Sequence, residues 1–245
     1  MKILFSSSES KIEGGKYPPL SLNSFMQKEC YKKRLKVIKK YNDIIMHDEL
    51  VKVCKIFGIK NIKECQRYRK DIFIQKCIKA IKRYSGVAYQ YLDYQNLKKD
   101  EQEYIDNNTL IFSNLFGAIF AKDKIPFYKL KQGEKLEGFN IENFYKNECS
   151  KSLDLLLQDE DILDLRAAFY EKFYRINKRY TKLKFVKNKK VVSHWAKAYR
   201  GIVLKEIAKA KISNINEFME LSIDGLKVLE IEKNSNFDLI VLEIS

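Results

Sequence analysis

The sequence is poor in the residues from which metal centres and disulfide frameworks are built. It has two histidines, His47 and His194, and five cysteines, none of them in a C-x-x-C pair. An odd number of unclustered cysteines is typical of reduced thiols in a cytoplasmic protein, and Cys54 and Cys77 fall in helix-like apolar patterns that predict core thiols. Because a helical Glu-x-x-His spacing is also missing, we predict no metal site and no cofactor.

Proline, glycine and long apolar runs are equally scarce. With 3 Pro and 9 Gly in 245 residues, a long flexible linker is not expected, and we predict a single domain over residues 1–245. No apolar run approaches the roughly 18 residues that span a bilayer, and the stretch Ile3–Phe5 is too short for a secretory signal. We therefore expect a cytoplasmic protein with no membrane partner.

Recognised catalytic motifs are missing as well. The sequence contains no P-loop, no G-x-G-x-x-G and no recognised nucleophile–base pair, so we assign no catalytic residue. His194 beside Trp195 is a candidate base, but a histidine at a strand end is more often structural.

An excess of positive charge is the strongest feature of the amino-acid composition. Lys and Arg number 47 against 32 Asp and Glu, which gives a net charge of +15 at pH 7. A basic surface attracts polyanions through counterion release, and this attraction carries no sequence information. The composition is also rich in Lys, Ile, Asn and Tyr, as expected from an A·T-rich genome. A solvated basic surface without a ligand is therefore the alternative.

Helix-like and strand-like patterns alternate without a regular βαβ rhythm, which predicts a mixed α/β (α+β) fold with a mixed sheet. Strands are expected at 3–5, 110–115 and 161–165, with hairpins over 183–195 and, at the C-terminus, 226–244. Helices are expected at 24–45, 48–57, from 61 onward, at 71–84, 141–157 and 196–210. Because both ends of the chain resemble strands, we expect one compact unit closed by its termini.

Residues 48–70 have the outline of a helix–hairpin–helix. An apolar helix ends at Gly58, and Asn61 is a good cap for a second helix. Such a turn exposes backbone N–H groups to a DNA phosphate, and neighbouring lysines add charge. The candidate phosphate-binding residues are Gly58, Ile59, Lys60, Asn61 and Lys63. Lys60 stands where the usual motif has a second glycine, so two helices joined by a glycine cap are the alternative.

Residues 169–200 are dense in Lys, Arg and aromatic residues, a pattern that suits phosphates and unpaired bases. Lys197 and Arg200 are three residues apart in an expected helix and so share a face, where they form a candidate anion clamp. The alternative is a solvated hairpin with ordinary core aromatics.

Several short motifs, in order along nearly the whole chain, resemble the YaaA family of small bacterial proteins. They are Ile3-Leu4-Phe5-Ser6, Gly86-x-x-Tyr89, Phe112–Gly117, Asp123 with Tyr128-Lys129-Leu130 and Gly133, Leu165 with Tyr170 and Lys172, and Ala196-Lys197-x-x-Arg200-Gly201. The resemblance implies a single-domain mixed α/β fold with a helix–hairpin–helix and a basic cleft. It also implies DNA binding, including non-duplex forms, that limits damage by peroxide and iron. The cleft residues implied here are Ser6, Lys11, Tyr89, Tyr128, Lys129, Tyr170 and Lys172.

This sequence departs from the family pattern at several polar positions. The opening loop lacks Ser-Pro-x-Lys, and Val87, Phe120, Lys131, Ala167 and Phe169 replace an aspartate, an arginine, a glutamate, a serine and a glutamate. Because backbone binding tolerates such losses better than chemistry does, we predict a largely sequence-independent DNA-binding protein of the peroxide response. The alternative is an enzyme that acts on a small anionic, nucleotide-like ligand in the basic cleft.

Overall fold

The sheet is built around the first strand of the chain. In the computed structural model, which describes residues 1–188 and 190–245, β1 (Lys2–Ser6) pairs in parallel with β3 (Thr109–Ser113) on one side and β6 (Ile162–Asp164) on the other. Ile3, Leu4 and Phe5 are buried on both faces of the sheet, as expected of a central parallel strand. The apolar segment at the N-terminus is therefore the middle of the core.

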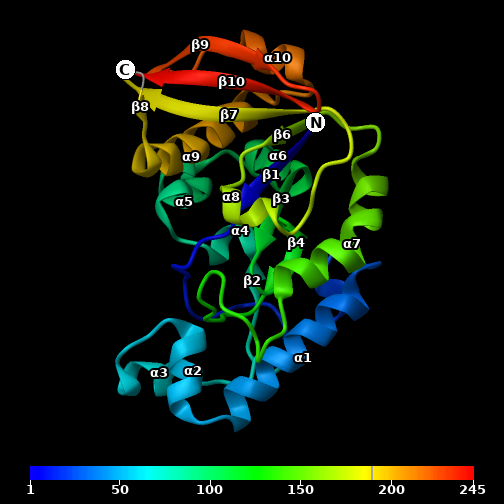
Figure 1. Cartoon of the computed structure of the whole chain (residues 1–245), viewed down its shortest axis with the longest axis vertical. Coiled ribbons are helices and arrows are strands. Elements are labelled where there is room, and N and C mark those ends of the chain that lie inside the picture. The colour runs from blue at the N-terminus through cyan, green and yellow to red at the C-terminus, as the bar shows by residue number, and fades with distance from the viewer. Residues whose placement is uncertain (189) are drawn as a thin grey trace.

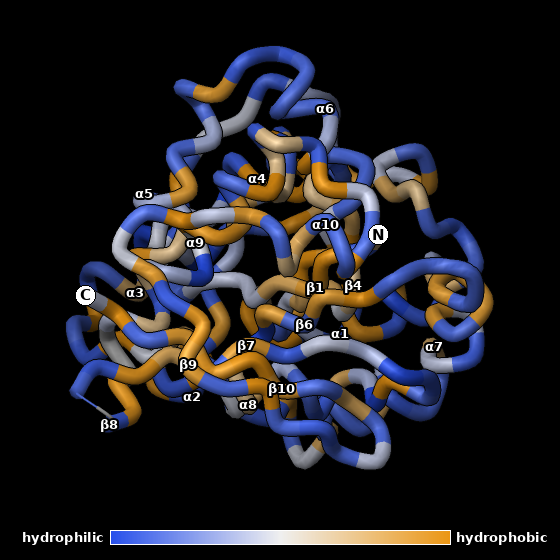
Figure 2. Tube along the Cα trace, turned by 90° about the horizontal axis from the view of Figure 1, so that it is seen from above, coloured by the Kyte–Doolittle hydropathy of each residue, from blue (hydrophilic) through white to orange (hydrophobic). Residues whose placement is uncertain are grey.

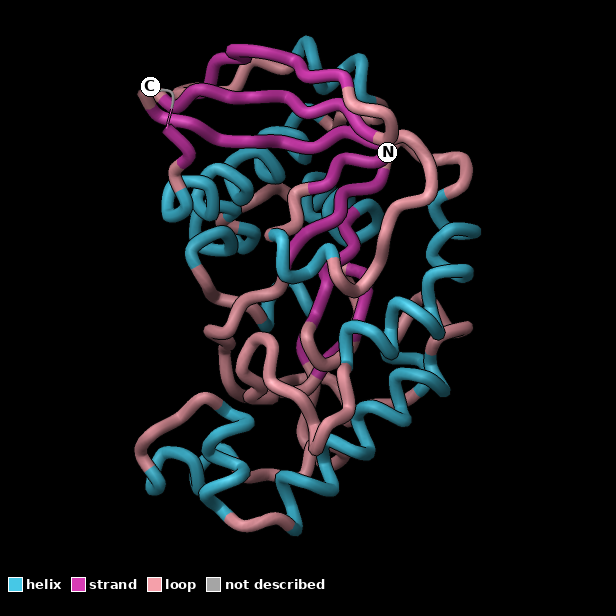
Figure 3. Tube along the Cα trace, in the orientation of Figure 1, coloured by secondary structure: helices cyan, strands magenta, loops and turns pink. Residues whose placement is uncertain are grey.

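The described residues place eight strands in this mixed sheet, in the order β4-β3-β1-β6-β7-β10-β9, with β8 paired to β7 (Figures 1 and 3). The remaining strands are β4 (Gly117–Phe120), β7 (Tyr180–Lys187), β8 (Lys190–Val191), β9 (Leu226–Lys233) and β10 (Phe237–Ile244). The inner pairs are parallel, whereas β4, β8 and β9 are antiparallel to their neighbours. Because β1 and β10 share this sheet, the predicted compact mixed α/β fold is confirmed.

Helices pack around the sheet and leave the polar loops outside (Figure 2). They are α4 (Ala80–Arg83), α5 (Val87–Leu92), α6 (Lys99–Asn108), α7 (Ile141–Leu157), α8 (Ala168–Glu171), α9 (Ser193–Ala210) and α10 (Ile215–Glu220), with 3-10 turns at Leu22–Ser24 and Tyr94–Asn96. Gly201 lets α9 approach α5 closely, because a Cβ there would lie 2.0 Å from the carbonyl oxygen of Ala88. α9 also packs against β7 and α6.

The helices α1 (Tyr31–His47), α2 (Leu50–Phe57) and α3 (Ile62–Tyr68) lie at the opposite end of the molecule from β9 and β10 (Figures 1 and 3). Val37, Ile38, Tyr41, Ile44 and Ile45 form the buried stripe of α1, at the spacing of a helix face, while four of its lysines, Lys32, Lys33, Lys36 and Lys39, are exposed. Among the described residues, no helix is both long and apolar enough to cross a membrane.

The predicted helix over 71–84 is wrong. Residues 71–77 form turns and an isolated bridge, β2 (Ile78–Lys79) pairs with β5 (Lys124–Ile125), and only α4 is helical. Ile74, expected to face inward, is 74% exposed, and Arg83, expected outside, is buried, where it donates to the carbonyls of Gly14 and Ile125. The pairing of Cys77 with Tyr17 decides the backbone here, and such long-range pairing overrides a local helical period.

The second strand of the predicted 183–195 hairpin is shorter than expected. β8 covers two residues, and Trp195 lies in α9 instead of in a strand. His194 also belongs to α9, so it does not lie at a strand end. Lys189, part of the predicted polar turn, is outside the described residues. The C-terminal hairpin is confirmed as the antiparallel pair β9–β10.

Candidate functional site

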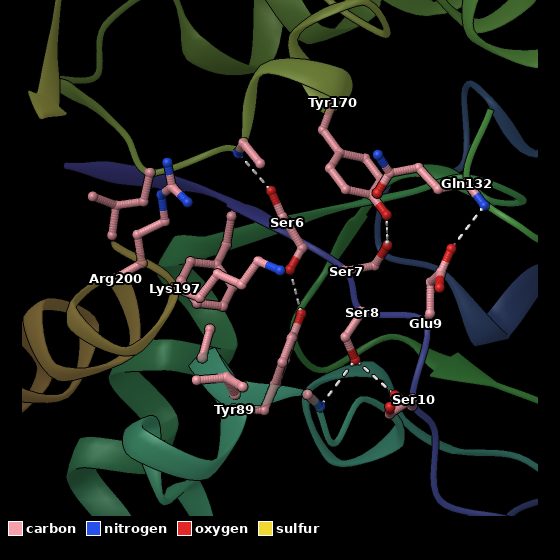
Figure 4. Close-up of a pocket in the computed structure, with 16 residues that line it drawn as sticks. Ser6, Ser7, Ser8, Glu9, Ser10, Tyr89, Gln132, Tyr170, Lys197 and Arg200 are labelled. Carbon is pink, nitrogen blue, oxygen red and sulfur yellow. Dashed lines mark hydrogen bonds between the residues drawn. The ribbon is translucent and has the colours of Figure 1, made fainter. Parts of the chain in front are cut away.

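A pocket of about 450 Å³ opens where the chain leaves β1 (Figure 4). β1 has parallel neighbours on both sides, and the pocket lies against the segments that follow β1 and β6 at their carboxyl ends, the edge at which open α/β sheets bind ligands. The pocket is lined by Phe5, Ser6, Ser7, Ser8, Glu9, Ser10, Gly86, Val87, Ala88, Tyr89, Gln132, Leu165, Ala167, Tyr170, Lys197 and Arg200.

The serine loop after β1 is held by hydrogen bonds to two other segments. The Ser6 hydroxyl accepts the N–H of Ala167 at 2.8 Å, and its carbonyl accepts the Tyr89 hydroxyl at 2.8 Å. The Ser7 hydroxyl donates to the Tyr170 hydroxyl at 3.0 Å, and the Ser8 hydroxyl accepts the N–H of Gly86 at 3.1 Å. One wall is therefore fixed to α5 and the other to the segment around α8.

Two cations enter the pocket from α9. Lys197 is exposed and extends towards Ser6, with Arg200 beside it, half-buried (Figure 4). Burial lowers the pKa of Arg200. Two carboxylates, Asp164 and Glu171, oppose this effect on the pKa of Arg200. Both form ion pairs with other residues, Asp164 with Arg166 and Glu171 with Lys182. This wall therefore offers positive charge to an anion.

Lys11, Tyr128 and Lys129 form a second group beside the pocket. The Lys11 Nζ lies 4.2 Å from the centre of the Tyr128 ring, and the Tyr128 hydroxyl is 3.1 Å from that of Tyr84 and 2.8 Å from the Ser113 hydroxyl. Burial and, after it, the charge of Lys129 lower the pKa of Lys11 to about 7. Burial raises the pKa of Tyr84 to about 12 and those of Tyr89, Tyr128 and Tyr170 above the ordinary value, so these phenols carry their protons at neutral pH.

The α2–α3 turn lies close to one edge of the pocket. Gly58 ends α2 with φ +71°, and the Asn61 side chain accepts the N–H of Glu64 at 3.1 Å. A Cβ on Gly58 would lie 3.2 Å from the Lys131 side chain, and the N–H of Lys131 donates to the carbonyl of Ile56. Since the next residue, Gln132, lines the pocket, this contact links the turn to the pocket.

The predicted site residues thus fall into three places. Ser6, Tyr89, Tyr170, Lys197 and Arg200 meet in the pocket, and Lys11, Tyr128 and Lys129 form the group beside it. Gly58, Ile59, Lys60 and Asn61 form the α2–α3 turn and Lys63 lies in the first turn of α3, with Lys60 and Lys63 exposed. Lys172 is exposed, with its Nζ over the Phe169 ring and outside the pocket lining.

Sequence reasoning missed Ser7, Ser8, Glu9 and Gln132 as pocket residues. The run of serines directly after a buried strand was the available signal for the first two, since such a loop lies at the ligand-binding edge of a sheet. No local signal marks Gln132. Its backbone N–H donates to the Glu9 carboxylate at 3.1 Å, a contact between residues distant in the sequence.

Two of the departures from the family pattern lie in the pocket itself. Val87 and Ala167, where the pattern has an aspartate and a serine, both line it. The pocket therefore lacks polar groups at two positions while it retains its cations and tyrosines. In the described part of the chain, no group of three His, Cys, Asp or Glu side chains is placed to hold a metal ion.

Comparison with known proteins identifies the family. The profile described as "Peroxide stress protein YaaA" matches residues 1–232. The chain belongs to this family. An uncharacterized protein of Campylobacter jejuni is 48% identical over 244 residues, which cover 100% of this chain and 99% of the relative.

More distant relatives share the full length with this YaaA-family chain. A UPF0246 protein of Fusobacterium nucleatum is 27% identical over 250 residues, covering 97% and 98% of the two chains. One of Corynebacterium glutamicum strain ATCC 13032 is 29% identical over 244 residues, covering 96% of each. The resemblance stated from short motifs is thus confirmed, and with it membership of a peroxide-stress family.

Proposed function

We propose that this YaaA-family protein binds DNA during peroxide stress by holding backbone phosphates at the pocket after β1 and at the α2–α3 turn. The observation that carries the proposal is the position of Lys197 and Arg200. Both enter one pocket from one helix, beside a loop of serine hydroxyls, and the carboxylates near Arg200 are already paired. Two such cations suit a phosphate group, and the Ser6 hydroxyl, which accepts the N–H of Ala167, keeps a proton to donate to a phosphate oxygen.

The size of the pocket supports a nucleotide as the bound unit. A volume of about 450 Å³ is in the range of small-ligand sites, and the tyrosines and the Leu165 side chain supply apolar surface for a base. An unpaired nucleotide of a longer strand fits this description, which favours non-duplex DNA. The same property favours the second candidate, a free nucleotide-like anion.

The α2–α3 turn supplies the second contact in this proposal. Lys60 and Lys63 are exposed on it, and the contact between Gly58 and Lys131 places it next to the pocket segment that contains Gln132. A strand whose phosphate is held by Lys197 and Arg200 would then extend towards the turn. Binding of this kind depends on charge and position, so it tolerates the loss of polar groups at Val87 and Ala167.

The test is fluorescence anisotropy with labelled duplex and bubble DNA, using wild type and Lys197→Ala/Arg200→Ala. Loss of two phosphate contacts should weaken binding by roughly tenfold or more, and bubble DNA should bind more tightly than duplex. The control is Lys32→Ala/Lys39→Ala on the exposed face of α1. It removes the same amount of charge from residues that do not line the pocket.

Equal weakening in both double variants would mean that general charge, and not the pocket, carries the binding. Absence of DNA binding together with saturable binding of a mononucleotide would replace the proposal with the second candidate. Circular dichroism of each variant checks that it is folded.

A further inference from the structure

Two cysteines from distant parts of the sequence meet between α1 and α7. Cys30 directly precedes α1, and its Sγ lies 3.0 Å from the Ser152 hydroxyl of α7. Cys149 is one helical turn before Ser152, whose hydroxyl also donates to the Cys149 carbonyl at 3.0 Å, and the two thiols act on each other's pKa. Both thiols are free and almost wholly buried.

The surroundings favour a thiolate at Cys30. The Cys149 thiol has the largest effect and lowers the pKa of Cys30. The hydrogen bond with Ser152 and the charge of Arg34 also lower this pKa, whereas burial and the charge of Glu29 raise it. The Cys30 thiol in turn raises the pKa of Cys149, so the second thiol keeps its proton. The pair therefore has one nucleophilic sulfur and one protonated sulfur in contact.

Arg34 strengthens this assignment because its buried guanidinium forms no ion pair in the described part of the chain, and the carboxylate on which its charge acts is that of the buried Asp123. The guanidinium is 1% exposed and donates to the carbonyls of Phe116, Gln27 and Ala118 and to the Gln27 side-chain oxygen, all of them neutral. Within residues 1–188 and 190–245, no carboxylate forms an ion pair with it. A thiolate at Cys30, which caps the helix four residues before Arg34, partly neutralises a charge that would otherwise be costly to bury.

A second close pair of cysteines provides an internal comparison. Cys54 of α2 and Cys65 of α3 also act on each other, but here burial and, after it, the Cys54 thiol raise the pKa of Cys65 to about 12. Proximity alone therefore does not produce a reactive thiol in this fold. Cys77, the fifth cysteine, has its pKa raised to about 11 by burial.

We propose that Cys30 and Cys149 are a peroxide-reactive dithiol that closes to a disulfide between α1 and α7. The Cys30 thiolate attacks one oxygen of hydrogen peroxide, so that an S–O bond forms, the O–O bond breaks and hydroxide leaves. The Cys149 sulfur then attacks the Cys30 sulfenic acid, and the S–S bond forms as water leaves with the thiol proton. Two thiols lose two electrons, and one peroxide becomes two waters once the hydroxide takes up the proton released by Cys30.

Burial decides which oxidants react. Cys30 is 2% and Cys149 5% exposed, so a molecule of the size of water reaches the sulfur far more easily than a bulky organic peroxide. The pair should therefore select for hydrogen peroxide by size. This inference does not depend on the DNA-binding proposal.

The test starts with fully reduced protein and one equivalent of hydrogen peroxide, followed by alkylation and non-reducing peptide mapping by mass spectrometry. The expected product is a Cys30–Cys149 disulfide with loss of two thiols, while Cys54, Cys65 and Cys77 stay alkylatable. Cys149→Ser should stop at a Cys30 sulfenic acid that dimedone traps, and Cys30→Ser should react roughly tenfold or more slowly. Cumene hydroperoxide should be slower than hydrogen peroxide by a similar factor.

Cys77→Ser is the matched control and should oxidise like the wild type. A disulfide between Cys54 and Cys65, uniform slow oxidation of all five thiols, or unchanged kinetics in Cys30→Ser would each overturn the proposal. If a serine variant does not fold, differential alkylation of the wild type after partial oxidation still ranks the five thiols, and Cys30 must be first.

Discussion

Lys11 illustrates how the fold changes the chemistry of a single side chain. Its ammonium group lies over the Tyr128 ring and donates to the Glu9 carbonyl at 3.2 Å, and Lys129 adds a like charge. Burial is the main reason that its pKa falls to about 7, so at neutral pH this residue is partly a neutral amine. A neutral amine cannot hold a phosphate by charge, which is why the DNA-binding proposal rests on Lys197 and Arg200.

Lysine titration provides a direct check of this residue. After reductive ¹³C-methylation, the NMR resonance of Lys11 should titrate near pH 7, and in Lys129→Met its midpoint should move upward because a like charge is gone while burial remains. The sign is set by the lowered pKa, so Lys11 is charged below pH 7 and neutral above it. A midpoint near 10 in the wild type, or no movement in Lys129→Met, would contradict this description. Lys11→Arg assigns the resonance.

Among the elements, those that depend on local pattern could be predicted from the sequence. The helix over 141–157 matches α7, because Asn140 caps it and its apolar residues follow a helical period. The strands at 3–5 and 226–244 were identified by short apolar or alternating runs. The segment 71–84 could not be predicted, because its backbone is fixed by pairing with Tyr17 and with β5, which are distant in the sequence.

The same distinction applies to the candidate site. The clamp of Lys197 and Arg200 followed from helical spacing alone, and the structure brings both to one pocket. Their partners could not be predicted, because Ser7 meets Tyr170 and Glu9 meets Gln132 only through the sheet topology. The thiol pair escaped detection for the same reason, since Cys30 and Cys149 come together only when α1 packs on α7.

The contact between α5 and α9 positions the whole pocket and can be tested at Gly201. In most helices Gly→Ala stabilises by about 1 kcal/mol, but here the new Cβ would lie 2.0 Å from the Ala88 carbonyl oxygen. We expect Gly201→Ala to destabilise the protein by about 1–3 kcal/mol in urea denaturation and to weaken DNA binding, because α9 must move away from α5.

Gly14→Ala is the control for this change. Gly14 has φ +77° with open space around it, so the variant should lose about 1 kcal/mol through backbone strain and keep its DNA affinity. A stabilised Gly201→Ala, or equal loss of DNA affinity in both variants, would show that the α5–α9 contact does not set the pocket.

At the scale of the whole molecule, a net charge of +15 makes weak binding to any polyanion expected, so affinity alone does not identify a site. The fold separates two kinds of basic residue. The lysines of α1 are spread over an outer face, whereas Lys197 and Arg200 converge on a pocket at the carboxyl end of β1. In the DNA-binding proposal it is the second kind that fixes the position of a phosphate.

The salt dependence of binding separates these contributions. Each phosphate neutralised on B-DNA contributes about −0.9 to the slope of log K against log salt concentration. Because Lys197 and Arg200 hold one phosphate together in this proposal, Lys197→Ala/Arg200→Ala should reduce the magnitude of the slope by about 0.7 on single strands and about 0.9 on duplex relative to the wild type. Lys32→Ala/Lys39→Ala should leave the slope nearly unchanged, because diffuse charge on α1 contacts no fixed phosphate. A slope that falls equally in both variants would assign the binding to net charge, and one that falls in neither would place the phosphates elsewhere on the protein.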